Sequence, residues 1–396
     1  MLNRALTDVI AKSAEKMPVI TIIGPRQSGK TTLARATFPD KAYFSLESPA
    51  NREAARSDPE GVLARFPKGV IFDEVQRAPD LLSYIQVAVD ENDMPGRFVL
   101  TGSQNFLLMQ TVSQTLAGRT ALLTLLPFSV RELTQLAPVD PRGLMFVEEE
   151  TEPGTELWQT LWTGLYPRIH DKGLDPGRWL ADYHRTYVER DVRDVLKVMD
   201  VDGFERFVRL AAARTGQELN YASLAADAGI SQPTARQWMT TLRVSSLVTL
   251  LLPHHQNYRK RLRKRPKLHF LDTGLVCYLL GIHSPSVLRN HPLRGAIFES
   301  FVVSELTKAF VHRGLEAPLY HWRDATGHEV DVIVDLGDRL VPVEVKSSVT
   351  LGSHVFDGLR WWTGIGSNPT TGGMLVHGGK ARHEQDGFSV RPWWIW

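Results

Sequence analysis

A glycine-rich segment near the start of the chain carries the clearest chemical signal. Residues 24–31 read GPRQSGKT and fit the pattern G-x-x-x-x-G-K-[ST] at every position. An apolar, β-branched run precedes the segment at 19–23, and a run that can start a helix follows at 32–36. A phosphate-binding loop requires this strand–loop–helix setting. Backbone N–H groups and the helix N-terminus would then face a polyphosphate.

The residue types in this loop predict ATP and Mg²⁺ as ligands. Lys30 is expected to reach the β- and γ-phosphates, and the Thr31 hydroxyl is expected to hold Mg²⁺. The loop and the residue after it are the predicted nucleotide-binding residues: Gly24, Pro25, Arg26, Gln27, Ser28, Gly29, Lys30, Thr31 and Thr32.

Two carboxylates at the end of an apolar run, residues 69–74, complete the predicted hydrolytic site. We expect Asp73 to hold the Mg²⁺ shell and Glu74 to orient and deprotonate the attacking water. Phosphoryl transfer depends mainly on positioning and charge stabilisation, so this small set of residues suffices.

Further polar residues extend this site. Ser103, with Gln104 and Asn105 after it, ends another apolar run and is a candidate sensor of the γ-phosphate. Arg119 is a candidate arginine finger acting in its own subunit or a neighbour's, with an ordinary salt bridge as the alternative. Arg26 and Arg77 are additional basic candidates.

The elements that must position these residues alternate between strands and helices. Strands are expected at 19–23, 42–46, 69–74, 97–103 and 120–126. Alternation of this kind predicts an α/β domain with a parallel sheet and helices on both faces. Ligands bind such sheets at the carboxyl ends of the strands, where the polar residues gather.

Residues 203–270 have the signature of a winged helix. A helix predicted within 219–230 ends in a glycine turn at Gly229, and Ser231 can cap the next helix, 232–243. The β-rich runs 247–252 and 268–270 flank a basic segment that would form the wing. Its basic residues are Arg259, Lys260, Arg261, Arg263, Lys264, Arg265 and Lys267.

This motif predicts a nucleic-acid partner. The second helix of a helix–turn–helix enters the DNA major groove, and basic side chains neutralise phosphates. The candidate contacts on that helix are Gln232, Thr234, Arg236 and Gln237. DNA is the expected partner and RNA stays open. Winged helices also serve as protein–protein modules or rigid linkers, which is the alternative.

A carboxylate–lysine constellation lies in the last third of the sequence. Glu344 and Lys346 lie two residues apart on one face of a predicted strand, Asp331 on the strand before it, and Glu299 on a predicted helix. Pro342 predicts that the second strand starts at an edge or a bulge. Asp331 and Glu344 could bind a second Mg²⁺, and Lys346 could activate water. The order of these residues resembles the PD-(D/E)XK nuclease core, with Glu299 as the helix acid; the alternative is a nuclease-like fold that only scaffolds or binds DNA.

Length and composition set the remaining bounds. A chain of 396 residues is expected to form two or three domains. Cys277 is the single cysteine, so an intrachain disulfide is excluded. No signal core or membrane-length apolar run is evident, which predicts a cytoplasmic protein without a membrane partner. The expected boundaries are 1–135 for the ATPase domain, 136–202 for a linker and helical segment, 203–270 for the winged helix and 271–396 for the nuclease-like domain.

Nearly the whole sequence resembles a prokaryotic family of AAA-type ATPases with a C-terminal domain of unknown function. The motifs that carry the resemblance lie at 24–32, 73–77, 100–103, 117–119, 126–129, 187–192, 271–275 and 343–347. The resemblance implies a P-loop ATPase sheet, then a winged helix, then an α/β restriction-nuclease-like domain. It implies no settled biological role.

Two hypotheses follow from the sequence. In the first, an ATPase acts on nucleic acid, and its ATP state gates a DNA-binding, nuclease-competent C-terminal region. In the second, an ATP-dependent switch or adaptor, in regulation, defence or a toxin–antitoxin-like module, binds DNA or protein and cuts nothing. A homo-oligomer and a protein partner both remain open.

Overall fold

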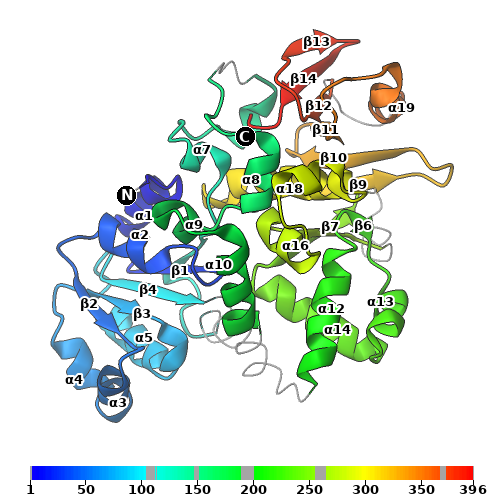
Figure 1. The fold of residues 1–396 in the computed structure, drawn as a ribbon. Helices are drawn as coiled ribbons and strands as arrows, with labels where there is room; N and C mark the ends of the chain where they lie inside the picture. The colour runs from blue at the N-terminus through cyan, green and yellow to red at the C-terminus, as the bar shows by residue number, and fades with distance from the viewer. Residues whose placement is uncertain are drawn as a thin grey trace. The chain divides into compact units, whose positions relative to one another are not determined.

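The computed structural model describes residues 2–103, 112, 114–146, 151–188, 200–254, 265–365 and 372–395 (Figure 1). They divide into two compact units, each with its own sheet and core. The smaller unit comprises Met1–Phe128, Val244–Ser246 and Val311–Leu315, and the larger comprises Ser129–Arg243, Leu247–Phe310 and Glu316–Trp396. The domain boundaries predicted at 135/136, 202/203 and 270/271 all lie within the larger unit and remain predictions.

The described part of the smaller unit contains a five-stranded parallel sheet in the order β2-β3-β4-β1-β5 (Figure 1). Its strands are β1 (Val19–Gly24), β2 (Ala42–Ser45), β3 (Val70–Asp73), β4 (Phe98–Ser103) and β5 (Thr120–Thr124). These are the five strands that the sequence predicts. β1, β3 and β4 are buried along their whole length, as suits central parallel strands, whereas β2 and β5 at the sheet edges are partly exposed.

Helices cover both faces of this sheet, as predicted. Ile20 and Ile22 pack with α1 (Leu6–Ala14) and α2 (Lys30–Thr37). Val19 and Ile23, which alternate with them, pack in the opposite core. The helices of that second core are α3 (Pro49–Ser57), α4 (Pro59–Ala64) and α5 (Leu81–Glu91). The two-residue alternation of a strand sends successive side chains to opposite layers.

The larger unit is built on one mixed sheet, ordered β13-β14-β12-β11-β10-β9-β7-β8-β6 among the described residues. Its strands are β6 (Gln217–Glu218), β7 (Val248–Pro253), β8 (Lys267–Phe270), β9 (Leu319–Arg323), β10 (Glu329–Asp335), β11 (Leu340–Lys346), β12 (Met374–His377), β13 (His383–Gln385) and β14 (Phe388–Pro392). Leu252 of β7 pairs in parallel with Tyr320 of β9. The hairpin of the predicted winged helix and the C-terminal strands therefore belong to one sheet.

Helices of the larger unit fall into three groups along the chain. The first group is α7 (Val130–Leu133), α8 (Leu157–Thr163), α9 (Pro167–Lys172) and α10 (Pro176–Tyr183). The second is α12 (Val201–Ala212), α13 (Tyr221–Ala228) and α14 (Gln232–Val244), and the third is α16 (Thr273–Leu279), α17 (Pro285–Asn290), α18 (Arg294–Val311) and α19 (Asp357–Thr363). The last residues of α14 and α18 begin segments that belong to the smaller unit.

The predicted helix–turn–helix is formed by α13 and α14. Gly229 ends α13 with φ +70°, and the Ser231 hydroxyl accepts a hydrogen bond from the Thr234 amide at 3.2 Å. Both features are as predicted, because a left-handed residue ends the first helix and a hydroxyl caps the second. Trp238 of α14 packs edge-on against Phe204 and Phe207 of α12.

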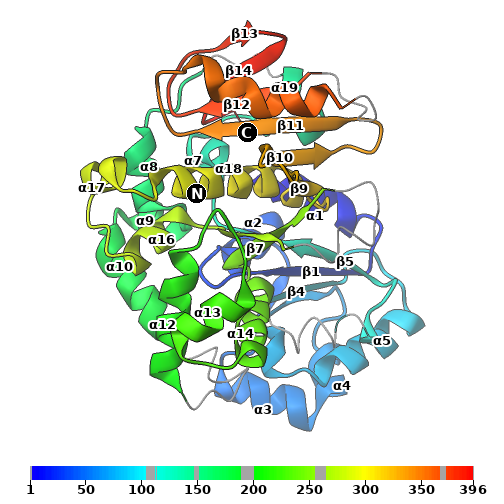
Figure 2. The ribbon, with the colours of Figure 1, turned by 90° about the vertical axis from the view of Figure 1, so that its right-hand side faces the viewer.

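The C-terminal strands follow α18 as an antiparallel meander, β9–β10–β11. Helix α19 then covers one face of these strands through Leu359 and Trp362 (Figure 2), and β12 returns parallel to β11. β11 lies between β10 and β12, but at Pro342 it pairs with β10 alone, so the prediction that the strand starts at an edge is confirmed at that residue. The proline is tolerated because pairing with β12 begins one residue later, at Val343.

Candidate functional site

The phosphate loop joins β1 to α2. Gly24 ends β1 with φ +149°, and a Cβ there would lie 2.1 Å from the carbonyl oxygen of Leu125, so only glycine fits. Gly29, at φ +94°, directly precedes α2. The Lys30 ammonium donates to the carbonyl oxygens of Gly24 and Pro25 at 3.1 and 2.8 Å. The loop therefore curls around a buried cation.

Asp73 lies at the end of β3 and faces this loop. Its Oδ1 accepts a hydrogen bond from the Thr31 hydroxyl at 2.7 Å and another from the Thr101 hydroxyl of β4. Its Oδ2 accepts one from the Tyr43 hydroxyl of β2 at 2.7 Å. Burial, together with the hydrogen bond to Asp73, raises the pKa of Tyr43 to about 12. Three strands and the loop thus converge on one carboxylate.

These residues fit Mg²⁺ and a polyphosphate. Hydroxyl and carboxylate oxygens are the ligands Mg²⁺ prefers, and Thr31 and Asp73 present one of each. The buried hydroxyls of Ser28 and Ser103 have no hydrogen-bond partner among the described residues. Ser103 lies opposite Gly24 in the β1–β4 register. A buried donor without a partner is costly, and a phosphate oxygen is the kind of acceptor that would satisfy it.

Glu74, the predicted water-activating residue, follows Asp73 in a left-handed backbone conformation with φ +59°. Its carboxylate accepts a hydrogen bond from the Gln76 side chain. This hydrogen bond occupies Oε2, and Oε1 remains as a second acceptor of the carboxylate. Gln104 and Asn105, predicted with Ser103 as sensors, lie outside the described residues.

Arg119 lies at the N-terminal ends of the strands, whereas the phosphate loop lies at their C-terminal ends. Its carbonyl oxygen accepts a hydrogen bond from the Val19 amide, at the start of β1, whereas the phosphate loop follows the end of β1. The intervening five-residue rise is roughly 16 Å. The guanidinium instead donates to both oxygens of Asp90, at 2.6 and 3.0 Å. This placement argues against a finger in the same chain, and action on a neighbouring subunit remains a prediction.

A cavity of about 500 Å³ opens beside the loop, lined by Thr31, Thr32, Arg35, Lys41 and Tyr43 among others. The Arg35 guanidinium lies 4.8 Å from the centre of the Tyr43 ring. Burial lowers the pKa of Lys41. Thr101, Tyr43 and this basic lining were not predicted from the sequence, because nothing local to those strands indicates that they reach Asp73.

The predicted carboxylate–lysine residues do converge in the larger unit. Lys346 donates to Glu344 at 2.5 Å, and one Asp331 oxygen accepts from the Val345 amide at 2.9 Å. A further member of this cluster, Lys267, was not predicted from the sequence to lie here. The Lys267 ammonium lies 3.1 Å from a Glu299 oxygen and 3.7 Å from an Asp331 oxygen.

Lys267 is therefore not a wing residue, contrary to the prediction. Its side chain is only 8% exposed, which leaves it unable to contact a nucleic acid. The wing residues Arg259, Lys260, Arg261, Arg263 and Lys264 lie outside the described residues, and Arg265 is exposed. The basic run thus has two parts. Residues 259–265 remain predicted nucleic-acid contacts, and Lys267 is buried.

Electrostatics in the cluster follow from burial and close charges. Burial, reinforced by the Asp331 charge, raises the pKa of Glu299 and of Glu344 to about 8 each. For Lys267, burial alone would lower the pKa, but the charges of Glu299, Asp331 and Glu329 outweigh it and raise the pKa. Desolvation favours neutral forms, whereas an opposite charge favours the ionised form.

The second Mg²⁺ site predicted at Asp331 and Glu344 remains a prediction. Lys267 already places a positive charge between Glu299 and Asp331. Within the described ranges, no group of three or more His, Cys, Asp or Glu side chains is arranged to hold a metal ion.

The predicted nucleic-acid contacts on α14 differ in exposure. Gln232, Arg236 and Gln237 are exposed, whereas Thr234 is half-buried with its hydroxyl 2.7 Å from that of Ser231. The Arg236 guanidinium stacks 4.4 Å from the centre of the Tyr221 ring. Three of the four side chains can therefore face a partner, and Thr234 has a capping role.

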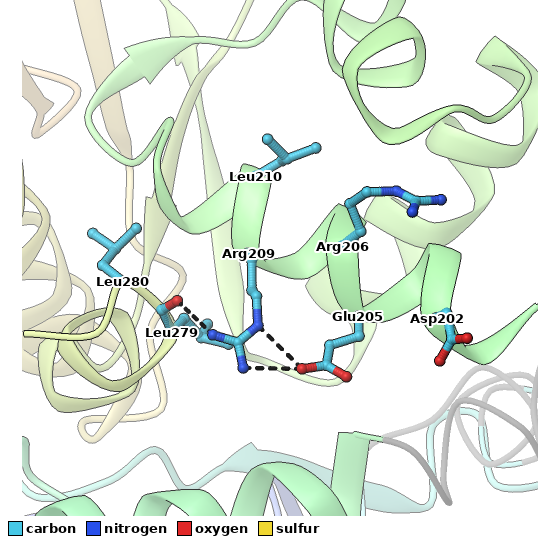
Figure 3. Close-up of a pocket in the computed structure, with 7 residues that line it drawn as sticks. All are labelled: Asp202, Glu205, Arg206, Arg209, Leu210, Leu279 and Leu280. Carbon is cyan, nitrogen blue, oxygen red and sulfur yellow. Dashed lines mark hydrogen bonds and ion pairs between the residues drawn. The ribbon is translucent and has the colours of Figure 1, made fainter.

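A second cavity, of about 520 Å³, lies in the larger unit between α12 and the end of α16 (Figure 3). Its floor holds Arg209, which donates to both Glu205 and the carbonyl oxygen of Leu279 (Figure 3). These donors are committed within the protein.

The sheet order, the phosphate loop and the Thr31–Asp73 contact define a P-loop ATPase domain, and residues 16–134 match the family described as "AAA domain". Residues 154–286 and 294–396 match two domains of unknown function, DUF8612 and DUF4143. The chain belongs to the family of the "Uncharacterized protein Rv2008c" of Mycobacterium tuberculosis and the "Uncharacterized protein Mb2031c" of Mycobacterium bovis. It is 32% identical to each over 345 residues, covering 86% of this chain and 73% of the relative.

Solved structures give weaker likenesses. The Walker-type ATPase PABY2304 of Pyrococcus abyssi is 15% identical, with a TM-score of 0.41, over 69% of this chain and 94% of that one. A RuvB variant from Thermotoga maritima is 18% identical, with a TM-score of 0.32, over 65% and 92%.

Across the described stretches, no helix is both long and apolar enough to cross a bilayer.

Proposed function

We propose that this chain binds and hydrolyses Mg²⁺-ATP at the phosphate loop. The observation that carries the proposal is the contact between Thr31 and Asp73, which brings the loop hydroxyl and the strand-end carboxylate within 2.7 Å. Those two groups would hold Mg²⁺, which when bound neutralises charge on the β- and γ-phosphate oxygens.

The chain's own residues have separate parts in this proposal. Lys30 would turn its ammonium from the loop carbonyls to the phosphates, which present stronger acceptors. Ser103 would donate to the terminal phosphate from the end of β4. Glu74 would orient the attacking water and accept its proton. Positioning and charge stabilisation supply most of the catalysis in this class of reaction.

ATP turnover tests the proposal directly. We expect Lys30→Ala to lower phosphate release by at least about 100-fold, the scale on which a charge-stabilising donor contributes. Lys41→Ala is the matched control, because Lys41 lines the cavity beside the loop but donates to the carbonyl oxygen of Gly96. Equal turnover by wild type and Lys30→Ala would refute the assignment.

Nucleic-acid binding is a second proposed function, supported by the exposed Gln232, Arg236 and Gln237 on the second helix of the α13–α14 motif. Binding of labelled duplex DNA and of RNA at several salt concentrations tests it. We expect Arg236→Ala to weaken binding and to reduce the salt slope by about one phosphate contact. Arg289→Ala, on exposed α17, is the control. Identical binding by the two variants would remove α14 from the interface.

Of the two sequence-based hypotheses, the ATP-dependent switch is the one we propose. Lys267 pairs with Glu299 and Asp331, two carboxylates of the predicted nuclease site, so we expect no Mg²⁺-dependent cleavage of DNA or RNA, with or without ATP. Nucleotide should instead change oligomeric state or partner affinity, and Lys30→Ala should abolish that change. Cleavage by wild type that disappears in Lys346→Ala would restore the nuclease hypothesis.

A further inference from the structure

The feature that neither hypothesis anticipates is the ammonium group inside the carboxylate cluster. We propose that Lys267 is a built-in counter-ion that takes the place of a divalent cation at Glu299 and Asp331, and that these carboxylates with Glu344 become a Mg²⁺- or Mn²⁺-binding site once the ammonium is removed. This inference goes beyond the proposed ATPase function and does not depend on it.

The position of Lys267 is fixed by the backbone. Lys267 begins β8 and pairs with Leu251 of β7 on one side and with Glu218 of β6 on the other. Its side chain is 8% exposed, as is that of Asp331, and that of Glu299 is 13% exposed. Strand pairing on both sides fixes the backbone of Lys267, and its side chain is buried. Lys267 is therefore a structural part of the cluster and not a flexible surface residue.

Charge explains why a metal ion and this lysine exclude each other. An ammonium and a divalent ion both need carboxylate oxygens at close range, and two cations in one buried site repel strongly. The Glu299 oxygen at 3.1 Å and the Asp331 oxygen at 3.7 Å already face the ammonium. A divalent ion could enter only if the ammonium left.

Glu344 offers a further oxygen ligand in the same cluster as Glu299 and Asp331. Glu344 is 6% exposed, and its Oε2 has no hydrogen-bond partner among the residues that the structure describes. Its Oε1 accepts from Lys346. Removal of Lys267 would leave an excess of hard oxygen ligands.

A matched lysine shows what is special about this site. Lys308 is also buried in the larger unit and lies 2.9 Å from the Glu305 carboxylate, with exposures of 1% and 0%. The second oxygen of Glu305 accepts from the Val130 amide. Lys308 is thus an ordinary buried ion pair with one carboxylate, which makes it the control for the effects of losing any buried lysine.

The test measures Mn²⁺ binding to the full, nucleotide-free chain, using the free-ion electron paramagnetic resonance signal. Wild type is expected to bind Mn²⁺ weakly. Lys267→Met should gain one site per chain and bind at least about tenfold more tightly, the scale on which neighbouring groups change metal affinity. Asp331→Asn in the Lys267→Met background should reverse the gain. Lys308→Met should gain nothing.

Each outcome is decisive. Lys267→Met that folds but binds Mn²⁺ no better than Lys308→Met overturns the inference. If Lys267→Met does not fold, the wild type still decides: Mn²⁺ binding by wild type that Asp331→Asn or Glu344→Gln abolishes would show that Lys267 excludes nothing. Mn²⁺ binding by wild type that is weak and unchanged in both variants would support the inference. ATP turnover, measured on the same samples, tests the ATPase proposal separately.

Discussion

Asp73 in the smaller unit and Asp331 in the larger unit are both strand carboxylates, and both are 6% exposed. Their partners differ in charge. Asp73 accepts from three neutral hydroxyls, those of Thr31, Thr101 and Tyr43, whereas Asp331 faces the Lys267 ammonium. When a metal ion binds Asp73, the neutral hydroxyls can turn away and no second positive charge remains in the site. When a metal ion approaches Asp331, the Lys267 ammonium remains as a second, repelling positive charge. Two equally buried carboxylates are therefore expected to differ in their affinity for a metal ion.

The largest expected difference between the two regions is in stability. Lys267→Met removes one partner of a buried ion pair and should lower the free energy of unfolding by about 3–5 kcal/mol. Thr101→Val removes a neutral donor from Asp73 and should cost only about 1–3 kcal/mol. Chemical denaturation of both variants provides the measurement. Equal losses would mean that the charge of the partner does not distinguish the sites.

The two carboxylates should also differ in their effect on ATP turnover. Asp73→Asn should reduce phosphate release by at least about 100-fold, because it removes the charge that would hold Mg²⁺. Asp331→Asn should leave turnover near the wild-type value. Steady-state phosphate release under saturating Mg²⁺-ATP checks both variants. A large loss in Asp331→Asn alone would reverse the assignment of the two sites.

Dependence on pH separates the clusters further. Burial raises the pKa of Glu299 and Glu344 to about 8, and an unfolded glutamate titrates near 4.3. Between these values the folded chain binds more protons than the unfolded chain, so stability should fall as pH rises from about 5 to 8. The slope is at most about 1.4 kcal/mol per pH unit for each group.

Thermal or chemical unfolding at a series of pH values measures this slope. Glu299→Gln and Glu344→Gln should each flatten it, whereas replacement of the exposed Glu53 by Gln should not. A wild-type slope that survives both cluster substitutions would contradict the expected titration.

The smallest effect is expected at Tyr43, whose hydroxyl hydrogen-bonds to Asp73. Tyr43→Phe should cost about 1 kcal/mol of stability without nucleotide. It should also tighten Mg²⁺-ATP binding slightly, because the metal no longer competes with that hydroxyl for Asp73. Calorimetric titration with Mg²⁺-ATP tests this, with Tyr84→Phe as the exposed control. Weaker binding in Tyr43→Phe would mean that the tyrosine helps to hold the nucleotide.

Local patterns explain what the sequence could predict. The loop glycines, the apolar strands and the cap at Ser231 depend on neighbours within a few residues, and each is found where expected. Lys267 could not be predicted, because Glu299 is 32 residues away in the chain and the lysine follows a basic run. Tyr43 and Thr101 were missed for the same reason, being 30 and 28 residues from Asp73.

The smaller unit also contains two short segments that follow Phe128 in the chain. The chain returns to this unit at Val244–Ser246 and again at Val311–Leu315, where the Leu126 amide donates to the His312 ring at 3.2 Å and Gly314 lies against Val9 and Leu123. A fragment cut at residue 135 would thus lose part of its own core surface. Expression of the nucleotide-binding unit by simple truncation should give a poorly soluble product, and gene fusions that exchange only the N-terminal third should fail for the same reason.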